Sequence, residues 1–121
     1  MSAGKQFTVA EAQRTLPLVR RIVADILATA GCLRDPETKR NSAETRRLVA
    51  QLESLMKELE QLGCQYKDWD FSIGLVDFPS VINGEDVLLC WRSDEPEIRW
   101  YHSYNGGYAG RRPIPADLVN R

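Results

Sequence analysis

The stretch that decides the fold of this chain is VDFPSVINGEDVLLCW, residues 76–91. Its centre, Asn83-Gly84, is the strongest short-range signal for a β-hairpin, because a type I′ turn needs positive φ at both central residues. A two-residue turn there pairs residues whose numbers sum to 167. Asp77 then lies opposite Cys90, and Phe78 lies opposite Leu89. The stretch therefore predicts two antiparallel strands in a defined register.

The following residues predict a third strand, since EPEIRWYHS continues the apolar alternation after a polar turn at residues 93–96. That turn would pair Cys90 with Arg99, and Arg92 with Glu97. Residues 64–67 are a candidate fourth strand. We expect a small antiparallel β-meander of three to four strands.

Strand alternation divides these side chains between two faces of the sheet. The expected core face holds Val76, Phe78, Val87, Leu89, Trp91, Ile98, Trp100 and His102, and the other face holds Leu75, Asp77, Leu88, Cys90, Arg92, Glu97, Arg99 and Tyr101. Cys90 and His102 fall on opposite faces in this register. They could share a metal ion or a proton only if a bulge intervened, so we expect neither a metal site nor a catalytic set.

The first half of the chain, residues 8–62, has helical periodicity with apolar residues spaced by threes and fours. Thr8 and Glu11 form a capping-box pattern, and Pro17 predicts a kink or break at residues 13–16. We expect the helix to end near Gly31, before a polar loop at residues 33–41. A second helix should start after Asn41 and end at Gly63.

These patterns together predict an α+β fold in one domain, residues 1–121. A long antiparallel helical hairpin with coiled-coil-like spacing (8–62) would pack on the small sheet, which is followed by a glycine-rich tail (63–121).

Composition narrows the class of protein. The 121 residues carry a net charge of −1, with 43% hydrophobic residues. Such a balance gives no support for nucleic-acid or membrane binding. No signal peptide is recognisable at the start, and the three cysteines are an odd number without a CxxC pair. We expect a cytoplasmic protein with free thiols and no cofactor.

Candidate ligand-binding residues gather in the last third of the chain: Asp77, Cys90, Arg92, Glu97, Arg99, His102 and Arg111. The first five lie in adjacent rows of the mixed face, either as a binding surface or as cross-strand charge pairs. Arg111 follows the tail NGGYAG, where glycine amides can form an anion-binding nest or a plain turn.

Four segments resemble a known family: FTVAEAQRTLPLV (7–19), LGCQYKDWDFSIGLVDFP (62–79), VLLCWRSDEPEIRWYH (87–102) and GGYAGRRP (106–113). They are similar to the prokaryotic family catalogued as domain of unknown function 2203. The resemblance implies no established activity, substrate or cofactor. Its pattern maps onto Asp77, Cys90, Trp91, Glu97, His102, Gly107, Gly110 and Arg111.

Three functional hypotheses follow. The leading one is a non-enzymatic interaction or scaffold protein that dimerises through its helices, because apolar residues such as Leu18 and Val49 widen the helical stripes beyond a two-helix seam. The alternative is a protein that binds a small molecule or anion on the sheet near the glycine-rich tail. A metal-dependent enzyme is the third.

Overall fold

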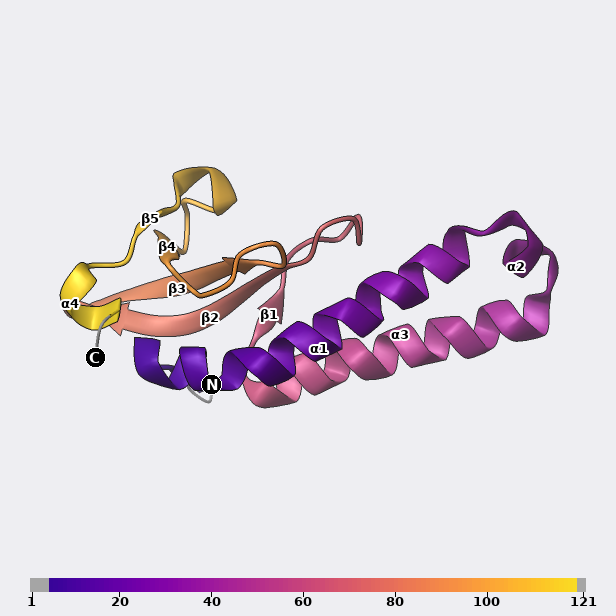
Figure 1. Cartoon of the computed structure of the whole chain (residues 1–121), viewed down its shortest axis with the longest axis horizontal. Helices are drawn as coiled ribbons and strands as arrows, with labels where there is room; N and C mark the ends of the chain where they lie inside the picture. Colours follow the sequence, from indigo (N-terminus) through magenta and orange to yellow (C-terminus); the bar gives the residue numbers. More distant parts are fainter. Residues whose placement is uncertain (1–4, 120–121) are drawn as a thin grey trace.

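The computed structural model describes residues 5–119 and has an α+β fold (Figure 1). The described helices are α1 (Val9–Arg34), α2 (Pro36–Arg40), α3 (Ser42–Leu62) and α4 (Ala116–Val119), with a short 3-10 helix η1 (Tyr108–Gly110). The strands are β1 (Gln65–Tyr66), β2 (Leu75–Ile82), β3 (Glu85–Arg92), β4 (Trp100–Ser103) and β5 (Arg112–Pro113). They form one antiparallel sheet in the order β1-β2-β3-β4-β5. The α+β class is confirmed, but the expectation of three to four strands was wrong, because the glycine-rich tail adds β5.

Local signals set the helix starts as expected. The Thr8 side chain accepts from the Glu11 amide and the Glu11 carboxylate accepts from the Thr8 amide, a complete capping box. Of the kink or break expected at residues 13–16, the break does not occur, because α1 runs through Pro17 and continues past Gly31 to Arg34. Pro17 is exposed, so the carbonyl that loses its partner can face water. The lost hydrogen bond is therefore tolerated.

The polar segment expected to be a loop contains α2. Asp35 accepts a hydrogen bond from the Thr38 amide, and Pro36 occupies the first turn. An N-cap aspartate followed by proline is a helix start. Next, α3 begins after the Asn41 cap and ends at Gly63 with φ 95°, as expected. In Figure 1, α1 and α3 lie side by side, and their α2 end extends beyond the sheet. Among residues 5–119, no helix is long and apolar enough to cross a membrane.

The core lies between one face of the sheet and the two long helices. It includes Val76, Phe78, Val87, Leu89, Trp91 and Ile98 from the sheet region, and Ala12, Val19, Val23, Ile26 and Leu59 from the helices. Trp91 and Phe78 are fully buried. Burial of such large apolar side chains is the main driving force for this packing.

The register of β2 and β3 is confirmed, since Asp77 pairs with Cys90 and Phe78 with Leu89. The expected register of β4 was wrong by one residue: Cys90 pairs with Trp100 instead of Arg99. Leu88 consequently pairs with His102. A shift of one residue moves every side chain of a strand to the other face of its sheet, so His102 lies on the same face as Asp77 and Cys90.

Contacts from α1 accompany this shift. The Gln13 side-chain amide donates to the Ile98 carbonyl at 2.8 Å, and its oxygen accepts from the Ile98 amide at 3.1 Å. Arg20 donates to the Pro96 carbonyl at 2.8 Å. These contacts hold residues 96–98 against the helix instead of against β3, so the ladder begins only at Trp100. The expected Arg92–Glu97 pair does not form.

Candidate functional site

Three side chains that can ligate a metal converge on the face of the sheet opposite the helices. Asp77, Cys90 and His102 come from β2, β3 and β4, and each is about as buried as the core, with 2–3% of its surface exposed. One carboxylate oxygen, one sulfur and one ring nitrogen lie within 4.8 Å of one another. The cluster combines residues that the expected register had separated.

The orientation of the His102 ring is set by the backbone. Its Nδ1 lies 2.7 Å from the Ser103 carbonyl oxygen. A carbonyl only accepts, so Nδ1 carries a hydrogen. Nε2 lies 3.1 Å from Asp77 Oδ2, and this contact needs one hydrogen between the ring nitrogen and the carboxyl group, because a lone pair and a carboxylate oxygen both accept. A bound metal ion would take the place of that hydrogen. A backbone hydrogen bond that fixes the tautomer in this way is typical of histidine ligands in metal sites.

Burial shifts both acidic groups of the cluster toward their neutral forms. Burial raises the pKa of Asp77, although the nearby His102 and Lys67 partly offset the effect. Burial, and then the Asp77 carboxylate, raise the pKa of the Cys90 thiol to about 12. A bound cation would reverse this preference by stabilising the carboxylate and the thiolate together.

The same geometry argues against a cysteine nucleophile activated by histidine. Such a dyad needs a free imidazole nitrogen facing the thiol and a second group that orients the other nitrogen. Here the Asp77 carboxylate contacts Nε2 itself, and Nδ1 is held by a backbone carbonyl. The raised pKa of Cys90 is likewise opposite to that of an activated thiol.

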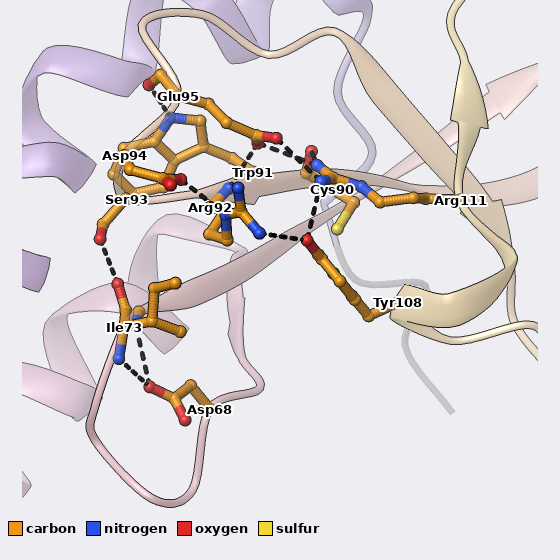
Figure 2. Close-up of polar contacts among 11 residues, drawn as sticks. Asp68, Ile73, Cys90, Trp91, Arg92, Ser93, Asp94, Glu95, Tyr108 and Arg111 are labelled. Atoms are coloured by element: carbon orange, nitrogen blue, oxygen red, sulfur yellow. Dashed lines mark hydrogen bonds and ion pairs between the residues drawn. The ribbon is translucent and has the colours of Figure 1, made fainter.

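Arg111 and Glu95 support the strand that carries Cys90 (Figure 2). The guanidinium binds the Glu95 carboxylate through Nη1 and Nη2, each at 2.8 Å, and Nη2 also donates to the Cys90 carbonyl at 3.2 Å. Glu95 Oε1 in turn accepts from the Arg92 amide at 2.8 Å. The Arg111–Glu95 ion pair thus provides hydrogen-bond partners for the backbone at the end of β3, because the chain after Arg92 no longer pairs with a neighbouring strand.

Two aromatic rings also contact the Arg111 guanidinium. Its guanidinium carbon lies 5.0 Å from the Trp100 ring centre and 4.7 Å from that of Tyr108. These are cation–π distances. Only 12% of the Arg111 side chain is exposed, and its guanidinium is already bound to Glu95 and to the Cys90 carbonyl. Its role is therefore to stabilise this part of the fold rather than to bind an anion.

The remaining candidate residues stand apart from the cluster. Arg92 pairs with Asp94 at 2.6 Å, and Arg99 pairs with Glu97 at 3.1 Å in an exposed contact. Three of the seven candidates therefore converge, Arg111 stabilises the backbone beside them, and the other three form surface pairs.

Two residues that lie next to Asp77 were not among the candidates predicted from the sequence. Lys67 Nζ lies 3.8 Å from Asp77 Oδ2, and Gln65 pairs directly with Asp77 across β1 and β2. Both lie in the candidate fourth strand at alternate positions, which could have indicated a shared face. The pairing of Glu95 with Arg111 had no such signal, since a turn residue and a tail residue meet only in the folded chain.

Asp68 fixes the loop that leads into β2 (Figure 2). Its Oδ2 accepts from the amides of Ser72, Ile73 and Gly74, each at 2.8 Å. The Ser93 hydroxyl donates to the Ile73 carbonyl. The loop after Lys67 is therefore tied both to itself and to the β3–β4 turn, which holds β1 and β2 in place beside the cluster.

No curated protein and no solved structure matches this chain. The model of one family, described as uncharacterized conserved protein (domain of unknown function 2203), matches residues 5–114. This match covers nearly the whole chain and confirms the resemblance noted in the sequence. The chain therefore belongs to the family of domain of unknown function 2203.

Proposed function

We propose that this protein binds a divalent transition-metal ion of the zinc class through Asp77, Cys90 and His102. The observation that carries the proposal is the convergence of three different ligand atoms within 4.8 Å at a buried position. Ligand atoms of a tetrahedral zinc site lie roughly 3.3–3.8 Å apart, given bond lengths of about 2.0–2.3 Å. A contraction of about 1 Å at the widest spacing would close the cluster around an ion.

The types of ligand favour zinc or a similar ion over magnesium or calcium. Those two ions prefer oxygen ligands, whereas a thiolate with an imidazole selects zinc, cobalt or related metals. Three protein ligands also leave one coordination position open. This is the arrangement of zinc sites that take water or an exogenous ligand, in contrast to structural sites with four protein ligands.

The competing interpretation is a metal-free core in which His102 and Asp77 simply satisfy each other. Uptake of Co²⁺, followed by elemental analysis and visible absorption, separates the two. We expect one Co²⁺ per chain and a thiolate-to-cobalt charge-transfer band in the native protein. Cys90→Ser should lose the band, and Cys32→Ser should keep it, because Cys32 is exposed and free.

Circular dichroism would show whether the variants fold, and Asp77→Asn provides a second variant in which the thiol remains. Absence of any Co²⁺ or Zn²⁺ uptake by the folded native protein would refute the proposal. A charge-transfer band that survives in folded Cys90→Ser would also refute it.

We also infer that the protein forms a homodimer through α1 and α3, as the spacing of apolar residues suggests. Leu18 on α1 and Val49 on α3 are 44% and 41% exposed, and the α2 end of the helix pair extends beyond the sheet (Figure 1). Covering such residues with a second copy would bury apolar surface. Light scattering of native protein and Leu18→Glu tests this: a native monomer at every concentration would contradict it.

A site built from free arginines has less support. Arg92 and Arg111 are held by Asp94 and Glu95, so an anion would have to displace a carboxylate from either. The geometry favours the metal site.

A further inference from the structure

Lys67 lies between the candidate metal ligands and solvent. It follows β1, and its amide donates to the Leu75 carbonyl at 2.8 Å, so its backbone is attached to β2. Its ammonium is 3.8 Å from Asp77 Oδ2. The Lys67 side chain is 43% exposed, but that of Asp77 only 4%. A ligand that approaches Asp77 from this side of the sheet must therefore pass a positive charge.

The charges of the cluster leave Lys67 without a counterion once a metal binds. A divalent ion with the Asp77 carboxylate, the Cys90 thiolate and the neutral His102 ring has zero net charge. The metal then takes over the carboxylate that Lys67 pairs with in the metal-free protein. The ammonium, 3.8 Å from Asp77 Oδ2, then lacks a carboxylate partner of its own.

The ion pair next to Cys90 does not supply a negative charge. Arg111 Nη2 donates to the Cys90 carbonyl, and the same guanidinium binds the Glu95 carboxylate through two contacts. The charges of Arg111 and Glu95 therefore cancel.

We propose that the open coordination position of the metal takes a small monoanion, such as a carboxylate, with Lys67 as its countercharge. This inference rests on the proposed metal binding. A monoanion on the metal restores a neutral site that includes Lys67, whereas a neutral ligand leaves the charge unbalanced. Charge-assisted contacts of this kind are stronger than contacts between neutral groups.

The test uses the Co²⁺-loaded protein titrated with azide or acetate and followed by its visible spectrum. We expect both anions to change the cobalt bands with saturation. In Lys67→Met the affinity for azide should fall roughly threefold to tenfold, and Lys67→Arg should retain most of it. Lys57→Met is the matched control, since Lys57 is an exposed lysine on α3.

Cobalt bands that azide and acetate leave unchanged would overturn the inference, and so would equal azide affinity in Lys67→Met and the native protein. Either result would leave metal binding intact. Failure of Co²⁺ to bind at all would refute the metal site and the anion together, so the two failures are distinguishable. Cobalt binding by Lys67→Met should be at least as tight as in the native protein, because the metal no longer competes with the ammonium for Asp77.

Discussion

Replacing Arg111 by Ala tests whether the Glu95 ion pair holds the end of β3. The substitution removes two contacts to Glu95 at 2.8 Å, one to the Cys90 carbonyl at 3.2 Å, and two ring contacts. It also leaves the Glu95 carboxylate, 16% exposed, without its partner. Breaking a buried ion pair costs about 3–5 kcal/mol. Partial exposure reduces this figure, so we expect the free energy of unfolding to fall by roughly 3 kcal/mol.

Urea unfolding followed by circular dichroism measures this loss, and Arg99→Ala is the control. Arg99 pairs with Glu97 on the surface, with side chains 55% and 49% exposed, so its loss should cost less than about 1 kcal/mol. A double-mutant cycle with Glu95→Ala should give a coupling energy of about 1–3 kcal/mol. A loss in Arg111→Ala no larger than in Arg99→Ala, or strict additivity in the cycle, would refute the reasoning.

Three further perturbations test the parts of the fold that position the cluster. Gln13→Ala removes both hydrogen bonds to the Ile98 backbone, so we expect a loss of roughly 2 kcal/mol and faster hydrogen exchange at the Ile98 amide; unchanged exchange would contradict this. Gly74 and Gly84 both have positive φ, but only at Gly74 would a Cβ approach another side chain to 2.6 Å. Thermal unfolding should therefore show Gly74→Ala to be clearly less stable than Gly84→Ala, and equal losses would count against the packing described. Burial raises the pKa of Asp68, but its backbone hydrogen bonds outweigh that and hold it below 3.8. Its stabilisation is thus complete above the unfolded value and lost as pH falls through the lower folded value. In Asp68→Asn the free energy of unfolding should therefore fall less steeply as the pH is lowered. An acid dependence equal to that of the native protein would contradict the stabilising role of the Asp68 carboxylate.

Features encoded by neighbouring residues were predictable. The Thr8–Glu11 capping box and the left-handed Gly63 act within a few residues of chain. Asn83-Gly84 sets the register of β2 and β3 for the same reason, because the turn geometry propagates along both strands. The errors in these regions were also local: Pro17 is tolerated on an exposed face, and Asp35-Pro36 begins a helix.

The candidate site was predictable only in its residue types. Asp77 and Cys90 were placed opposite each other correctly, but His102 was assigned to the wrong face. The segment before β4 is bound by Gln13, 85 residues away from Ile98 in the chain, whose side chain holds that segment against α1. No pattern within residues 87–102 predicts the contact between Gln13 and Ile98.

The sequence by itself determined the α+β class, the helix caps and the β2–β3 hairpin, and it placed Asp77, Cys90 and His102 among seven candidate ligand-binding residues without predicting a metal site. These follow from periodicity and turn chemistry, which depend on residues close together in the chain. Only the tertiary structure decided that the three side chains share one face, because the residues before β4 make contacts with α1, which is distant in the chain. Because side chains alternate between the two faces of a sheet, a difference of one residue in the register of β4 decides whether His102 lies away from Asp77 and Cys90 or beside them.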